Sequence, residues 1–248
     1  MNPHLVILST GLVVGVLYGM FGVGSALATP LLALAGVPGM VAVTAPLPAI
    51  LPGSALGGWS HWRRGTVDRR LALWTLMGAV PASIAGAAAS RHVSGTALVV
   101  ASGAALLAVG IRVVLPDRAN VARVRAARRD RAALVIPAAA ACGFFAGLLA
   151  NGGGFLLVPL FLLVFGLEVP EAAGTSLVAV TAITVPTLVA HSLLGGFDWT
   201  VTVLFGIGML PGTIAGARLG DRLPLGRLRP AFGVLLLGLA ALVLVRFI

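Results

Sequence analysis

Apolar residues are grouped along the chain in long stretches that are separated by short polar segments. The stretches are Leu5–Phe21, Val41–Trp59, Leu71–Ala89, Ala97–Leu115, Ala132–Ala150, Ala172–Leu194, Val201–Leu219 and Pro230–Phe247. Each is near the roughly 20 residues that a helix needs to cross the hydrocarbon of a bilayer. Apolar and polar residues do not alternate along them, which does not favour a strand barrel. The pattern predicts an all-α polytopic membrane protein of about eight transmembrane segments.

Composition agrees with lipid as the solvent. Of 248 residues, 59% are hydrophobic and 10% charged, whereas a soluble domain carries about 25% charged residues. The net charge of +10 comes from Arg alone, because the chain has no Lys. Most of these arginines lie in the polar segments, where positive charge holds loops on the cytoplasmic side. We therefore expect a lipid bilayer, and no nucleic acid, as partner; a homodimer is compatible with the sequence.

The chain contains two copies of one four-segment unit. The ten residues 78–87 recur in similar form at 208–217, and several landmarks recur 130 residues later: His61 and His191, Asp68 and Asp198, Pro81 and Pro211. Composition alone would not align His, Asp and Pro at one offset, so the repeat indicates a duplication. We predict a first transmembrane repeat at 1–116, a basic cytoplasmic linker at 117–131 and a second repeat at 132–248.

The orientation of the repeats depends on two apolar pieces that are too short to span, Ala26–Ala35 and Phe155–Phe165. If each piece only dips into the membrane after a full span, the repeats are parallel, with 12 arginines on the linker side and 5 opposite. If each forms a re-entrant hairpin with the preceding helix, the repeats are inverted, and the counts become 15 and 2. The positive-inside rule favours the inverted arrangement, and the length of the first and fifth segments favours the parallel one.

A glycine-rich break precedes each short piece. Glycine clusters disfavour a continuous helix, and irregular backbone survives in a membrane only inside protein or beside a wet cavity. The N-terminus of the half-helix that follows offers free N–H groups to an anion; the alternative is that glycine only allows close helix packing. The candidate substrate-binding residues at the breaks are Gly22, Gly24, Ser25, Asn151, Gly152, Gly153 and Gly154.

Hydroxyl and imidazole groups lie near the breaks in both halves. Thr44, Thr175 and Ser176 follow the short pieces, and either complete a polar pocket or bond their own backbone. His61 and His191 occupy equivalent places near helix ends, and are either a proton relay or structural. The sequence offers no clustered metal ligands and no nucleophile–base arrangement. We expect no catalytic residue, metal or cofactor, and therefore no enzyme.

These motifs together resemble the sulfite exporter TauE/SafE family of bacterial membrane permeases, over nearly the whole chain. The first half carries Gly22–Ser25, Pro30–Leu31, Ala42–Ala45, Arg63–Asp68 and Gly78–Ala87, and the second carries Gly152–Gly154, Pro159–Leu160, Ala173–Ser176, Gly195–Asp198 and Gly208–Ala217. The chain departs from the family pattern in Ser25, in Ala45 and in lacking the Arg pair before Gly195. The resemblance implies multi-pass insertion in the bacterial cytoplasmic membrane and transport of sulfite, organosulfonates or related anions.

Two functional hypotheses follow for a membrane protein of this kind. The first is an alternating-access carrier in which the broken helices bind a small anion near the junction of the repeats. The second is a channel-like pore for a small anion or neutral solute, with the same breaks acting as a filter. Saturable flux against a gradient indicates the carrier, and unsaturable downhill flux indicates the pore.

Overall fold

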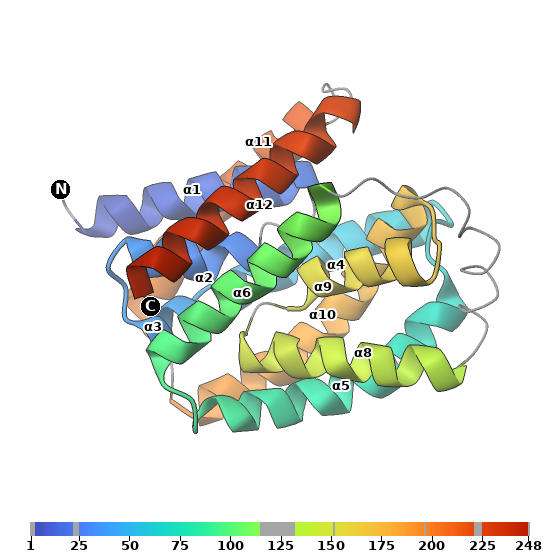
Figure 1. Cartoon of the computed structure of the whole chain (residues 1–248), viewed down its shortest axis with the longest axis horizontal. Coiled ribbons are helices and arrows are strands. Elements are labelled where there is room, and N and C mark those ends of the chain that lie inside the picture. The colour runs from blue at the N-terminus through green and yellow to red at the C-terminus, as the bar shows by residue number, and fades with distance from the viewer. Residues whose placement is uncertain are drawn as a thin grey trace. The chain divides into compact units, whose positions relative to one another are not determined.

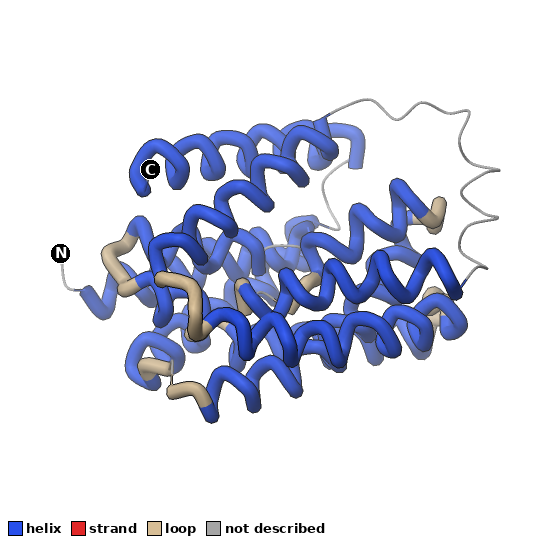
Figure 2. Tube along the Cα trace, turned by 60° about the horizontal axis from the view of Figure 1, so that its bottom comes forward, coloured by secondary structure: helices blue, strands red, loops and turns tan. Residues whose placement is uncertain are grey.

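The computed structural model describes residues 3–21, 25–114, 132–150, 152–195, 197–220 and 225–247. These residues form helices joined by short loops, and none of them lies in a strand (Figures 1 and 2). The helices are α1 (Pro3–Phe21), α2 (Ser25–Leu34), α3 (Gly39–Thr44), α4 (Leu47–Arg63), α5 (Arg69–Ser90), α6 (Gly95–Val114), α8 (Ala132–Leu148), α9 (Gly154–Pro159), the π-helix η2 (Leu160–Val164), α10 (Val169–Leu193), α11 (Trp199–Gly220) and α12 (Leu225–Phe247).

Several of these helices are long and apolar enough to cross a membrane. Among the described residues, four spans meet both criteria: 39–63, 69–90, 170–193 and 199–216. The described parts of α1, α6, α8 and α12 add shorter apolar helices. The predicted all-α membrane protein is thereby confirmed in its helical, apolar character.

The helices form two compact units, and each unit takes segments from both halves of the sequence. Unit 1 comprises residues 1–49, 92–116 and 195–248, and unit 2 comprises residues 50–91 and 117–194. The described helices of unit 1 are therefore α1, α2, α3, α6, α11 and α12. Unit 2 contains most of α4 together with α5, α8, α9, η2 and α10.

In unit 1, α1 packs along α11 at glycine positions. A Cβ on Gly11 would overlap the carbonyl oxygen of Phe205, and one on Gly15 would overlap that of Met209. The contacting residues increase together along both helices, so α1 and α11 are parallel. Small residues allow this close approach of two backbones, as is common in membrane proteins.

In unit 2, α5 packs along α8 in the same way. A Cβ on Gly78 would overlap the carbonyl oxygen of Ile136, just as a Cβ on Gly208 of α11 would overlap that of Leu8 in α1. Gly208 lies 130 residues after Gly78, and Ile136 lies 128 residues after Leu8. The two helix pairs therefore use corresponding positions of the duplicated sequence.

A second pair in unit 1, α6 with α12, runs in opposite directions. A Cβ on Gly103 would lie 3.0 Å from Cγ1 of Val243, and one on Gly110 would lie 3.0 Å from Cδ2 of Leu237. The position on α12 falls as the position on α6 rises, so the two helices are antiparallel. These two helices follow α5 and α11 respectively and are the last helix of each sequence half.

Local sequence explains two helix boundaries. Asp68 caps α5, because its Oδ1 accepts the N–H of Leu71 at 3.0 Å, as short polar side chains do at helix starts. The predicted span at 41–59 is divided into α3 and α4 at Ala45 and Pro46. Ala45 itself keeps helical backbone angles, but Pro46 has no N–H to continue the intrahelical hydrogen bonds. α10 has no proline at the equivalent place and is continuous.

Candidate functional site

The second glycine-rich break is a sharp change of backbone direction between α8 and α9. Ala150, Gly152 and Gly153 have positive φ angles of 48°, 64° and 78°. Glycine adopts this region without strain, but for an alanine it costs about 1–2 kcal/mol. A strained residue of this kind persists only where its surroundings hold it, and such residues gather at functional sites.

The half-helix after the break begins at the backbone of Gly153. The Gly153 carbonyl accepts the N–H groups of Leu156 and Leu157, each at 3.0 Å. The N–H groups of Gly154 and Phe155 therefore precede the intrahelical bonding pattern, as in the first turn of any helix. The predicted short piece at 155–165 corresponds to α9 and η2, and it forms a π-helix immediately after Pro159.

The break is enclosed by the other helices of unit 2. A Cβ on Gly153 would lie 2.8 Å from the Cβ of Ala146 in α8. One on Gly152 would lie 3.0 Å from Oγ1 of Thr184 and 3.2 Å from Cγ1 of Val180, both in α10. Ala150 and the three glycines 152–154 are buried. The irregular backbone is thus surrounded by protein, which is where a membrane tolerates it.

The side chain of His191, on α10, forms a hydrogen bond to the C-terminal end of α8, just before the break. Its side chain is 1% exposed, and its Nε2 lies 2.9 Å from the Gly147 carbonyl oxygen. Since a carbonyl only accepts, Nε2 carries the proton and donates. The same carbonyl accepts the N–H of Ala150 at 3.3 Å. His191 therefore helps to satisfy the C-terminal end of α8 where the helix stops.

His61 has a different environment. It is half-buried at the end of α4, and its Nδ1 lies 2.8 Å from Oγ1 of Thr66 in the following turn. The neighbouring α10 approaches it through Gly174, where a Cβ would lie 2.8 Å from the Cβ of His61. His61 thus holds the turn between α4 and α5 against the beginning of α10. The proposed proton relay through His61 and His191 remains a prediction.

Two of the three candidate hydroxyl groups bond their own helix, and the third bonds a backbone N–H far along the chain. Thr44 donates to the Met40 carbonyl at 3.1 Å, and Ser176 donates to the Ala173 carbonyl at 2.9 Å. Thr175 instead accepts the backbone N–H of Asp68 at 3.0 Å. All three hydroxyl-bearing residues are buried. The bonds of Thr44 and Ser176 have the form of the structural alternative to a polar pocket, and the bond of Thr175 does not. A role of the three residues in substrate binding stays a prediction.

The side-chain surroundings of four candidate site residues lie outside the part of the chain that the structure describes. Gly22, Gly24 and Asn151 lie outside the described residues, as does the predicted linker at 117–131. Ser25 begins α2, but its side chain is likewise outside the description. The described part of the site is therefore the second-half break with Gly152, Gly153 and Gly154.

One hydroxyl at the break was absent from the sequence-based candidates. Thr184 lies in the middle of α10, seven residues before His191, and is fully buried. A threonine within an apolar helix carries no signal of its own, because most such hydroxyls bond the preceding turn. The signal available was its spacing from His191, which repeats as Ser54 and His61 in the first half.

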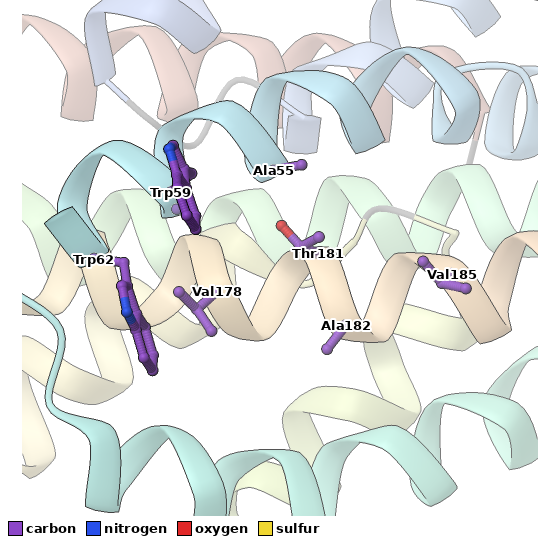
Figure 3. A pocket seen from close by; sticks show the side chains of 8 residues that line it. Ala55, Trp59, Trp62, Val178, Thr181, Ala182 and Val185 are labelled. Atoms are coloured by element: carbon purple, nitrogen blue, oxygen red, sulfur yellow. The ribbon is translucent and has the colours of Figure 1, made fainter.

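Unit 2 also contains an apolar groove between α4 and α10 (Figure 3). Its volume is about 310 Å³, and it is lined by Ala55, Gly58, Trp59, Trp62, Val178, Thr181, Ala182 and Val185. The Thr181 hydroxyl donates to the Leu177 carbonyl at 2.8 Å. The lining therefore suits an apolar group better than a small anion. Among the described residues, no group of three or more His, Cys, Asp or Glu could hold a metal ion.

Known proteins are similar to this chain over different shares of its length. The probable membrane transporter protein YjnA of Bacillus subtilis (strain 168) is 26% identical over 232 residues, covering 87% of this chain and 90% of that protein. A probable membrane transporter protein of Xylella fastidiosa (strain 9a5c) is 39% identical over 95 residues, covering 38% of this chain and 36% of that protein. No solved structure matches the chain significantly.

These names indicate a membrane transporter rather than an enzyme. The helical, apolar architecture and the buried glycine-rich break fit that description. Residues 7–243 match the model of the family described as Sulfite exporter TauE/SafE. Because this match spans nearly the whole sequence, the chain is a multi-pass membrane transporter that belongs to the TauE/SafE family.

Proposed function

We propose that the protein carries small sulfur-containing anions, such as sulfite or organosulfonates, across the bacterial cytoplasmic membrane. The observation that carries the proposal is the buried break at Ala150, Gly152 and Gly153, each of which has a positive φ angle. The family description names sulfite, and the break provides the kind of backbone surface that binds an oxyanion. The backbone N–H groups at the start of α9 are the proposed ligands.

The charge distribution supports binding by backbone groups. From Ala132 to Leu167 the sequence has no Asp, Glu, Lys, Arg or His. A helix N-terminus presents a partial positive charge, which stabilises an anion in a medium of low dielectric constant. The opposite end of the break is the carbonyl end of α8, and there His191 supplies a donor. An anion is thus favoured on the α9 side of the break.

The helix directions support inverted repeats. The helices α6 and α12 are equivalent in the two sequence halves and run antiparallel within unit 1. Parallel repeats require equivalent helices to cross the membrane in the same direction, whereas inverted repeats require opposite directions. We therefore favour the arrangement in which each half is a re-entrant hairpin followed by full crossings, with sequence repeats at 1–116 and 132–248.

The inverted arrangement also gives the orientation in the membrane. It leaves Arg91 and Arg246 on one side and the other 15 arginines on the side of the linker 117–131. By the positive-inside rule, the linker side is cytoplasmic. The same arrangement places both chain ends outside. Attaching a reporter that is active only in the cytoplasm to the end of α6 or the end of α12 tests this, since only the first fusion is expected to be active.

The transport proposal is tested with purified protein in proteoliposomes. Radiolabelled sulfite and taurine are offered over a range of concentrations, with empty liposomes as the control. A carrier gives saturable uptake that a pre-loaded unlabelled substrate accelerates, whereas a pore gives flux that rises linearly with concentration. Absence of protein-dependent flux for sulfite, taurine and sulfoacetate contradicts the proposed cargo class.

Gly153→Leu is expected to abolish flux while the protein still inserts into the membrane. The substitution places a side chain at a positive φ of 78° and against Ala146, so it fills the backbone-lined space where the anion is proposed to bind. Gly65→Leu is the matched control, because Gly65 has a φ of 71° but nothing within 4 Å of its added Cβ. Normal flux by Gly153→Leu rules out the proposed site.

A further inference from the structure

Thr184 is a fully buried residue with an unpartnered hydroxyl. Among the described residues, its Oγ1 is one of two buried side-chain oxygen or nitrogen atoms without a hydrogen-bond partner; the other belongs to Thr75 on α5. Buried polar groups are nearly always satisfied, so an exception calls for a specific explanation. One such explanation is a ligand that makes the missing hydrogen bond when it binds.

The other threonines of the same helix segment behave differently. Thr181 donates to the Leu177 carbonyl and Thr187 donates to the Ile183 carbonyl, each at 2.8 Å. This bond to the preceding turn is the ordinary solution for a threonine in an apolar helix. Thr184 makes no such bond. The difference lies in where its oxygen is directed.

The Thr184 hydroxyl is directed at the break. Its Oγ1 is the nearest atom to the position that a Cβ on Gly152 would occupy, at 3.0 Å. The next neighbours of that position are methyl carbons, from Val180 at 3.2 Å and Ile50 at 3.4 Å. The hydroxyl is therefore the polar group of α10 that meets the left-handed backbone of the break, in otherwise apolar surroundings.

We propose that the Thr184 hydroxyl binds the transported anion by donating a hydrogen bond to one of its oxygen atoms. The proposal rests on the function proposed above and names a side chain of that site, on α10. It also narrows the substrate class to anions with an exposed oxygen acceptor, such as the sulfite and sulfonate groups. A hydroxyl donor and backbone N–H donors together recognise such oxygens, because bonds to a charged acceptor are stronger than neutral ones.

Ser54, the residue of the first half equivalent to Thr184, does not have an unpartnered hydroxyl. Ser54 lies seven residues before His61, as Thr184 lies seven residues before His191. Ser54 is also buried, but it donates to the Leu51 carbonyl at 3.1 Å. The serine hydroxyl is thus used within its own helix. The inference therefore assigns the side-chain contact to Thr184 and not to Ser54.

The test compares Thr184→Val with Thr187→Val in the purified full-length protein. Valine keeps the shape of threonine and removes the hydroxyl, and Thr187 is an equally buried residue of the same helix with a partnered hydroxyl. The dissociation constant for sulfite is measured by isothermal titration calorimetry under anaerobic conditions, with taurine as a second probe. The Tm without ligand is measured by differential scanning fluorimetry. Thr184→Ser, which keeps the hydroxyl, is the rescue variant.

Thr184→Val is expected to raise the dissociation constant roughly tenfold or more, the loss of a hydrogen bond to a charged ligand. Its Tm without ligand should be unchanged or higher by up to about 2–4 °C, because no protein bond is lost. Thr187→Val should keep the dissociation constant and not raise the Tm, and Thr184→Ser should bind like the wild type. This opposition between stability and affinity distinguishes a binding role from a structural one.

Two results overturn the inference while leaving the proposed function in place. The first is wild-type affinity in Thr184→Val when the wild type itself binds sulfite or taurine. The second is a lower Tm for Thr184→Val without ligand, which shows that the hydroxyl stabilises the protein itself. If the wild type binds neither sulfite nor taurine, the proposed function fails, and the inference fails with it.

Discussion

His61 and His191 occupy the same position of the duplicated sequence, yet they hold different parts of unit 2. His61 is half-buried and bonds Thr66 in the turn between α4 and α5. His191 is buried and donates to the Gly147 carbonyl, where α8 ends at the break. Duplication has kept the residue while the partner has changed from a turn hydroxyl to a buried backbone carbonyl. A repeated residue therefore does not establish a repeated role, and the second histidine is the one connected to the candidate site.

The largest difference in stability between the His191 and His61 surroundings is expected from replacing a nearby glycine by alanine. The glycine is Gly147 beside His191 and Gly174 beside His61. In Gly147→Ala the new Cβ would overlap the Ser83 carbonyl, so α5 and α8 must separate. In Gly174→Ala the new Cβ would lie 2.8 Å from both the Cβ of His61 and the Thr66 carbonyl oxygen, which is a less severe overlap. Overpacking costs about 1–3 kcal/mol, or more in rigid surroundings, and we expect Gly147→Ala to reach or exceed the upper figure.

The measurement is the fraction of folded protein that remains after heating, read by fluorescence-detected size-exclusion chromatography. Gly238→Ala on α12 is the control, because an added Cβ there meets nothing within 4 Å. In a helix, alanine is favoured over glycine by about 0.5–1 kcal/mol, so this variant should be no less stable than the wild type. Equal losses of folded protein in Gly147→Ala and Gly174→Ala would show that an added methyl group costs the same at both sites, which contradicts the comparison.

The histidines themselves are expected to give the next largest difference. His191→Leu removes one of two donors to the buried Gly147 carbonyl and leaves the longer bond from the Ala150 N–H. We expect this loss to cost about 1–1.5 kcal/mol. His61→Leu removes a bond in a partly exposed turn, where we expect less than about 1 kcal/mol. His191→Gln, which keeps an N–H donor, should recover part of the loss. Thermal unfolding of the detergent-purified variants measures both costs, and a greater cost at His61 contradicts the comparison.

The smallest effect is expected for Thr66→Val, which removes the partner of His61 but leaves the imidazole in place. The turn retains the backbone bond from Thr66 N–H to the His61 carbonyl at 3.1 Å. We expect a loss of about 0.5 kcal/mol, or 1–2 °C in Tm. Scanning fluorimetry resolves such a shift when wild type and variant are measured side by side. A decrease in Tm of more than about 5 °C would show that the turn contributes as much to stability as the hydrogen bond at the break.

The sequence pattern predicted the helical, apolar character of the chain, because a hydrophobic stretch in lipid must satisfy its backbone hydrogen bonds internally and therefore forms a helix. Asp68 was also predictable as a cap, since it directly precedes an apolar stretch. The division of 41–59 into α3 and α4 was missed, although Pro46 carries the signal. Glycine patterns alone did not show which helices pair, because α1 meets α11 from the other end of the chain.

The candidate site was predictable only in its backbone part. Gly152 and Gly153 were identified because glycine clusters disfavour a continuous helix, and the structure shows that both adopt a positive φ. Thr184 was not, because its significance depends on a bond that is absent, and a sequence does not record which hydroxyls remain unpaired. Thr175 was placed near the breaks by sequence, and its partner turned out to be the Asp68 backbone, 107 residues away.

The exchange of helices between the sequence halves has a consequence for how the protein is made. When the ribosome has completed residues 1–116, α1 still lacks α11, and α5 still lacks α8. The glycine-containing faces of α1 and α5 therefore remain without their packing partners at this stage. α5 gains α8 first, and α1 gains α11 later. Neither half can therefore mature alone, and two genes encoding 1–116 and 132–248 should yield folded protein only when both are expressed in the same cell.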